Sequence, residues 1–175
     1  MVLVEPDILR PTQIFDAEIE VLPDAPKPLR SRQRVRVHIG TIEALARIQV
    51  LNDEGEIAVG EQDFAQIRLE TPVLAVPGER FIVRSYSPQN TIAGGSVIDI
   101  SAAKHRRKEI DDVRKYLNDL LAASDDIAAR IELFVQSAGK SGLSFAEIQA
   151  RTASKKNLLL AALDANFSSG LVVEA

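Results

Sequence analysis

The chain has 175 residues, 46% apolar and 26% charged, which suits one large or two small globular domains. It has no cysteine, which excludes disulfides, thiol catalysis and zinc–thiolate sites and fits a cytoplasmic protein. It has neither a signal segment nor the ~18 consecutive apolar residues of a membrane helix. The formal net charge of −4 argues weakly against a protein dominated by phosphate binding, but it leaves room for a local basic face.

The first part of the chain alternates between apolar and polar side chains with the period of two that is typical of β-strands. Six strands are expected, at residues 14–22, 33–39, 43–51, 64–69, 80–85 and 96–100. Prolines and glycines between these runs mark loops, because proline cannot donate a hydrogen bond to a sheet. Short antiparallel strands at this spacing predict a closed six-stranded barrel, which leaves no exposed sheet edge.

The alternation also predicts which side chains face the barrel core. Phe15 and Ile19 are expected inside in the first strand, and Val37 inside in the second. Asp16, with Glu18, is expected on the outer, solvated face.

From Arg106 the apolar period becomes helical. An apolar stripe over residues 110–121 predicts one helix, and Ser124-Asp125-Asp126 is expected to cap a second over 127–135. Ser144 and Glu147 have the spacing of a capping box and are expected to open a short helix that ends at Ala150.

A last helix is expected from about Lys155 to Phe167, after a turn and N-cap at 152–154, with Leu159, Leu163 and Phe167 on one face. A short strand over 171–173 should follow. This order predicts a winged-helix domain over residues 105–175 with an incomplete wing, joined to a barrel over 1–104. We therefore expect the chain to be a fragment of a longer protein.

The best candidate for nucleic-acid binding in the barrel is the basic strand face of Arg34, Arg36 and His38, extended by Arg32. Arginine suits phosphate because its planar guanidinium can donate two parallel hydrogen bonds. The alternative is a solvated outer face with cross-strand Glu or Asp partners. His38 has no catalytic partner at a recognisable spacing, so a surface or structural role is favoured over a general base.

Other candidates also have two interpretations. The pair Gly94-Gly95 could admit a ligand phosphate to the backbone, or it could relieve strain in the barrel. The cationic run 105–108, which contains Arg106 and Arg107, could contact RNA or could be a solvated linker. Lys155-Lys156 opens the last helix, where a spacer role is favoured over groove recognition.

No catalytic set, metal cluster or phosphate-loop motif is recognisable, so neither enzyme activity nor GTP binding nor another cofactor is expected of this chain itself.

Several short motifs, in a fixed order and spacing, resemble one family. They are Leu22-Pro23-Asp24-Ala25-Pro26-Lys27-Pro28-Leu29, His38-Ile39-Gly40-Thr41, Ala65-Gln66-Ile67-Arg68-Leu69-Glu70-Thr71-Pro72, Arg80-Phe81-Ile82-Val83-Arg84, Ser87-Pro88 and Thr91-Ile92-Ala93-Gly94-Gly95. Together they resemble the third domain of translational GTPases, and specifically that of the selenocysteine-specific elongation factors (SelB). The likeness is good over residues 8–105 and looser beyond. Ala93 departs from the pattern, since the family usually has glycine there.

The resemblance implies that the barrel helps to hold the T stem of an aminoacyl-tRNA. Its contacts would come from Arg84 and from the turn Ser87–Gly95, which includes Gln89, Thr91 and Gly94, with Thr41 as a further candidate. The intact factor would bind GTP and magnesium, and would deliver selenocysteyl-tRNA to the ribosome. Later winged helices would bind the selenoprotein mRNA hairpin, while the one begun here would serve as an arm towards them. No membrane partner is implied.

Two other functions remain open from the residues alone. A transcription regulator would combine a binding barrel with a DNA-binding winged helix, but the expected recognition helix carries the apolar run Leu158–Leu160 and few basic side chains. A structural spacer would bind no nucleic acid through either part.

Overall fold

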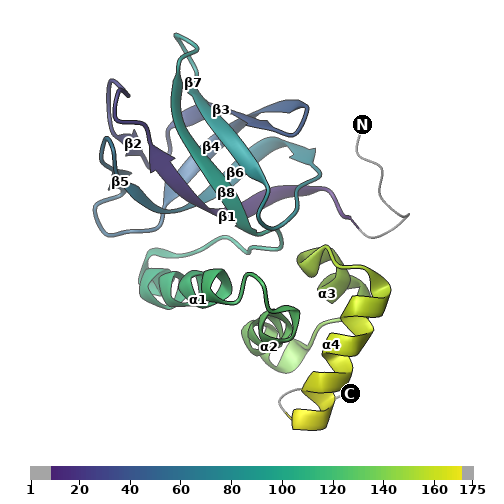
Figure 1. The fold of residues 1–175 in the computed structure, drawn as a ribbon. Coiled ribbons are helices and arrows are strands. Elements are labelled where there is room, and N and C mark those ends of the chain that lie inside the picture. Colours follow the sequence, from purple (N-terminus) through teal and green to yellow (C-terminus); the bar gives the residue numbers. More distant parts are fainter. Residues whose placement is uncertain (1–8, 171–175) are drawn as a thin grey trace.

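The computed structural model describes residues 9–170, and these form a β-barrel followed by a group of helices on one side of it (Figure 1). Six antiparallel strands close the barrel in the spatial order β1-β6-β4-β3-β7-β8. Their bounds are Thr12–Val21 (β1), Arg34–Ile39 (β3), Ile42–Val50 (β4), Gln62–Val73 (β6), Arg80–Ser85 (β7) and Thr91–Asp99 (β8). The predicted six-stranded antiparallel barrel is therefore confirmed.

The barrel closes around the apolar face of each strand. Phe15, Ile19 and Val37 have no exposed surface, as their alternation predicts, and the rings of Phe15 and Phe81 meet edge to face with their centroids 5.5 Å apart. Burying a large apolar side chain contributes roughly 1.5–3 kcal/mol, so this shared interior is the main source of the barrel's stability.

Two features of the barrel were not predicted. Leu29–Arg30 (β2) and Glu56–Ile57 (β5) pair as a small second sheet. The last barrel strand also begins at Thr91 rather than at residue 96, so the segment that was expected to be a turn is paired backbone.

The close packing around Gly95 explains why a glycine is needed at this position inside β8. A Cβ placed there would lie 2.4 Å from the carbonyl oxygen of Glu18 and 2.7 Å from Cζ of Phe81. The Phe81 ring thus fills the space that a side chain would take. Gly94 meets only the carbonyl of Phe81, at 3.6 Å, so the packing requirement falls on Gly95 alone.

Four α-helices follow the barrel, with 3-10 turns at Arg107–Glu109 and Gly139–Ser141. The helices are Ile110–Ala122 (α1), Ile127–Ala138 (α2), Phe145–Thr152 (α3) and Lys156–Ser169 (α4). None of the helices in this described part has the length and apolar character needed to cross a membrane.

The helix starts largely follow the predicted caps. Asp126 accepts a hydrogen bond from the backbone of Ala129, and Ser144 with Glu147 forms the predicted capping box. The hydrogen bonds from Ser144 lower the pKa of Glu147. Helix α4 differs, because its N-cap is Lys155 rather than residue 154; Leu159 and Leu163 are buried, whereas Phe167 is 38% exposed. The strand expected over 171–173 lies outside the described residues.

The helices are joined to the barrel by an apolar cluster. Leu51, Phe64 and Ile98 of the barrel pack with Leu117, Leu120 and Phe134 of α1 and α2. A second cluster, centred on Ile131 and Leu159, holds α2, α3 and α4 together. The two parts share buried surface, while the predicted division between residues 104 and 105 stays a prediction.

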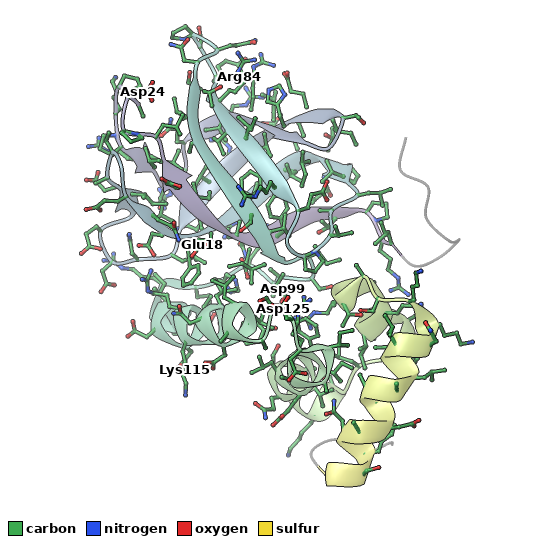
Figure 2. The ribbon with its side chains drawn as sticks, viewed as in Figure 1. Glu18, Asp24, Arg84, Asp99, Lys115 and Asp125 are labelled. Carbon is green, nitrogen blue, oxygen red and sulfur yellow. The ribbon has the colours of Figure 1, made fainter. Side chains whose placement is uncertain are left out.

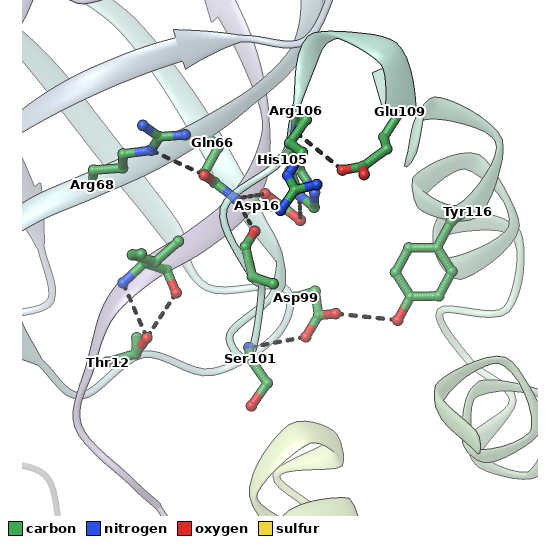
Figure 3. A network of polar contacts seen from close by, with 12 residues as sticks. Thr12, Asp16, Gln66, Arg68, Asp99, Ser101, His105, Arg106, Glu109 and Tyr116 are labelled. Atoms are coloured by element: carbon green, nitrogen blue, oxygen red, sulfur yellow. Dashed lines mark hydrogen bonds and ion pairs between the residues drawn. The ribbon is translucent and has the colours of Figure 1, made fainter. Parts of the chain in front are cut away.

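Polar side chains are also buried between the two parts (Figure 3). Asp99, 2% exposed, accepts hydrogen bonds from Arg151 (Nη2–Oδ2, 2.5 Å) and from the hydroxyl of Tyr116 (3.1 Å). Nearby, Oδ2 of Asp16 lies 2.7 Å from Nε2 of His105. The expectation that Asp16 faces solvent is thus wrong, because the linker after the barrel covers that part of the outer face.

Burial changes the ionisation of this network. It raises the pKa of Asp16, although the hydrogen bond and charge of His105 act in the opposite direction. Burial, with the neighbouring carboxylate of Asp99, also raises the pKa of the Tyr116 hydroxyl. Both shifts favour the neutral forms of these two side chains, as expected where water is largely excluded.

Candidate nucleic-acid interface

The predicted basic face lies on the outside of β3 and β7. Arg36 on β3 pairs in register with Arg84 on β7. Arg34, two residues before Arg36, lies by the C-terminal end of β7. The guanidinium carbons of Arg34 and Arg36 are 4.9 and 5.5 Å from the ring centre of Tyr86, the first residue after β7. Tyr86 thus holds two cationic side chains against one aromatic surface. We call Arg34, Arg36, Arg84 and Tyr86 the hairpin face.

Two of these arginines have carboxylate partners. Nε and Nη2 of Arg34 each donate to Glu70 at 2.9 Å, and Nη1 of Arg36 donates to Glu43 at 2.5 Å. The hydrogen bond from Arg36 lowers the pKa of Glu43, and that from Arg34 lowers the pKa of Glu70. The cross-strand Glu partners of the alternative interpretation are therefore present, and they neutralise part of the face.

Arg84 is different. It makes no hydrogen bond or ion pair with any residue of the part that the structure describes, and its covered Nε is without an acceptor there. Figure 2 shows Arg84 on β7, near the end of the barrel away from the helices. Its charge contributes to the lowered pKa of Glu43, but its N–H donors form no hydrogen bond there, so they can still be donated to an external anion.

His38 also faces outward on β3. Its Nε2 lies 3.3 Å from Oε2 of Glu43, without the alignment of a hydrogen bond. Together with Gly94 it lines a cleft of about 620 Å³, whose opposite wall carries Glu18 and Glu20. Those two carboxylates disfavour a phosphate near them, although Arg80 also lines the cleft, and at Gly95 the packing against Phe81 already accounts for the glycine.

The hairpin between β7 and β8 projects from the barrel end that lies away from the helices (Figure 1). Gln89 is exposed at its tip, and Thr91 is exposed opposite Arg84 in the ladder. The Ser85 hydroxyl donates to the carbonyl of Pro88, which follows a cis peptide bond. These two predicted residues are thus brought close to Arg84.

Thr41 is not brought to the hairpin face. It lies in the turn after β3, whereas Arg34 at the other end of β3 meets Tyr86. At about 3.3 Å per residue, roughly 20 Å of strand separates Thr41 from Arg34.

The cationic residues of the linker before α1 do not belong to the hairpin face. Arg106 and Arg107 are exposed just before α1, and they line a second groove, of about 430 Å³, with Arg32 and Arg68.

Sequence reasoning missed Tyr86, Arg47 and Arg68 as candidates. Arg47 pairs in register with both Arg34 and Arg68, so three arginines stand side by side on β3, β4 and β6. The basic side chains of these strands are visible in the sequence, but only the register shows that they are neighbours.

The helical part offers less. Lys155 and Lys156 are exposed at the start of α4, but Leu158 and Leu160 are also exposed there. Within residues 9–170 there is no group of three or more His, Asp or Glu side chains arranged to hold a metal ion.

Comparisons with known proteins agree with the resemblance in the motifs. Residues 16–104 match the family described as "Selenocysteine-specific elongation factor, beta-barrel domain". The chain is 36% identical over 160 residues to a selenocysteine-specific elongation factor of Desulfomicrobium baculatum, covering 90% of this chain and 24% of that protein. It is 28% identical over 137 residues to that of Haemophilus influenzae, covering 77% of this chain and 20% of that protein.

Among solved structures, the chain is similar to sup35 complexed with GDP, with a TM-score of 0.47 and 20% identity over 54% of this chain and 27% of that one. That likeness is too distant to carry an argument. The curated relatives are several times longer, since the chain spans about a quarter of one and a fifth of the other. The family match covers the barrel, and the first relative's similarity continues well into the helices. The chain therefore belongs to the family of selenocysteine-specific elongation factors, and its barrel is the β-barrel domain of that family.

Proposed function

We propose that this chain is the part of a selenocysteine-specific elongation factor that contacts the T stem of selenocysteyl-tRNA. The intact factor would bind and hydrolyse GTP through parts outside residues 1–175, deliver the tRNA to the ribosome in the cytoplasm, and bind the selenoprotein mRNA hairpin through later winged helices. The helices of this chain would be the first section of the arm towards that end. Family membership favours this function over a transcription regulator.

One observation carries the tRNA contact: within residues 9–170 Arg84 makes no hydrogen bond or ion pair, and it stands beside Arg36 at the base of an exposed hairpin. Arginine binds phosphate well because the guanidinium matches two phosphate oxygens at once. Gln89 and Thr91 add exposed polar groups next to it.

The experiment is binding of the chain to selenocysteine tRNA and to an ordinary elongator tRNA across a salt series. We expect Arg84→Glu to weaken binding by about 10-fold and to make the salt dependence shallower by roughly one phosphate contact. Lys115→Glu is the matched control, since Lys115 lies on α1 and points away from the barrel (Figure 2). Equal affinities of the Arg84 variant and this control would refute the proposed contact.

A further inference from the structure

We infer a second RNA-backbone site, separate from the hairpin face, built from four arginines that line a groove beside the linker before α1 and from a fifth that adjoins two of them. We call them the linker arginines: Arg32, Arg47, Arg68, Arg106 and Arg107. This inference rests on the proposed function only in taking RNA as the partner, and its residues lie outside the hairpin face.

The first observation is their position in the barrel. Arg47 pairs in register with Arg68 on the neighbouring strand, and its Nη1 donates to the backbone carbonyl of Arg32 at 3.3 Å. Arg32 and Arg68 then line one groove with Arg106 and Arg107. Three separate regions of the chain thus contribute positive charge to one surface.

The second observation is the lack of internal neutralisation. In residues 9–170, carboxylates within ion-pair distance hold Arg30, Arg34, Arg36, Arg114 and Arg151. None of the linker arginines has such a partner in that range. Arg68 bonds the neutral Oε1 of Gln66, at 3.0 Å, and four of the five are exposed. Arg47 acts on Glu70 only at longer range, so the N–H donors of these side chains that make no internal hydrogen bond can be donated to an outside anion.

The lining of the groove indicates what kind of anion. Leu51 and Ile110 are its apolar residues and both are buried, so the groove offers no exposed apolar patch of the kind that forms the centre of a protein interface. It has no Phe, Tyr or Trp on which unpaired bases could stack, and its one aromatic ring, the imidazole of His105, is mostly buried against Asp16. Its acidic residues, Asp53 and Glu54, belong to one exposed turn on the wall. The chemistry favours the phosphate backbone of a double-stranded RNA.

The spacing of the arginines supports an extended backbone contact. Neighbouring strands lie about 4.8 Å apart, so Arg34, Arg47 and Arg68 span roughly 10 Å across β3, β4 and β6. The linker arginines thus begin next to the hairpin face and continue towards the helices. A duplex bound at the hairpin would reach a second set of contacts there.

The test is binding of a short blunt-ended RNA duplex by the whole chain, from about 50 to 200 mM salt. The variant is Arg47→Glu/Arg107→Glu, and the matched control is Lys115→Glu/Lys140→Glu, which makes the same charge change on the helical part. Far-UV circular dichroism of each variant checks the fold. We expect the arginine variant to lose about 10- to 100-fold in affinity, with a salt slope shallower by roughly two, and the control to change little.

Arg47→Lys/Arg107→Lys keeps the charges and should retain most of the binding. Arg84→Glu, measured in parallel, separates the two sites. If Arg84→Glu weakens binding but the double arginine variant matches the lysine control, the second site is refuted and the hairpin contact stands. Binding of polyglutamate without binding of the duplex would also refute it, because the surface would then be one for acidic protein.

Discussion

Replacing Arg151 by methionine should test whether the buried ion pair fastens the helices to the barrel. Nε and Nη2 of Arg151 donate to Asp99, at 3.3 and 2.5 Å, and Nη2 lies 2.9 Å from the Tyr116 hydroxyl. Without the guanidinium, the Asp99 carboxylate keeps its hydrogen bonds from the Tyr116 hydroxyl and the backbone N–H of Ser101, together with the more distant charge of the buried Arg130. Methionine retains much of the packing on Phe134, over which the guanidinium carbon now lies at 4.2 Å.

Removing one partner of a buried ion pair typically costs about 3–5 kcal/mol, because the other charge stays buried without its counter-ion. Asp99→Asn in the same chain removes that charge, so we expect Asp99→Asn/Arg151→Met to cost about 1–3 kcal/mol less than the sum of the single variants.

The chain has two tyrosines and no tryptophan, which makes the assay direct. In a Tyr86→Phe background, Tyr116 at the interface is the single tyrosine, and its fluorescence during urea unfolding reports undocking of the helices. Circular dichroism measured in parallel follows the barrel and helices together. Strictly additive variants, or a cost below about 1 kcal/mol for Arg151→Met, would show that the pair does not fasten the interface.

Three further outcomes are expected. Val37→Asp places a charge in the closed barrel and should lower the free energy of unfolding by more than about 4 kcal/mol. Ile82→Asp, at an outward position that is 49% exposed, should leave urea unfolding nearly unchanged. A stable Val37 variant would reverse the inside-outside assignment. Gly95→Ala should cost about 1–3 kcal/mol in thermal unfolding and Gly94→Ala clearly less, and equal costs would contradict the packing argument. Because the folded state raises the pKa of Asp16, it binds that proton more tightly than the unfolded state, so this residue's contribution should fall as pH rises from about 3.8; Asp16→Asn should flatten that fall in urea midpoints measured from about pH 4 upward.

The barrel could be predicted largely because each strand carries its own alternation. Val35, Val37 and Ile39 show their inward direction without reference to any other strand, and all are buried. The strand pair β2–β5 has two residues on each side, which is too short for any period to be visible. The start of β8 was missed because glycine normally marks a turn, whereas Gly95 is required here by the ring of Phe81.

The candidate site depended more on contacts between distant segments. The sequence indicated Arg34, Arg36 and Arg84, but not that Glu70 and Glu43 hold the first two, or that Arg84 makes no hydrogen bond or ion pair within the described residues. The burial of Asp16 and Asp99 was equally hidden, because it results from a linker and helices that come later in the chain. Local patterns cannot show such coverage.

The shared interior of barrel and helices has a mechanical consequence. Phe134 lies beneath the guanidinium of Arg151 and packs in the same cluster as Phe64 of the barrel. Turning α2 relative to the barrel would have to separate apolar surfaces and expose a buried carboxylate at the same time. We therefore expect the helices and the barrel to move together as one rigid body. A displacement of α4 would then also displace β8, because α2 packs against both the barrel and α4.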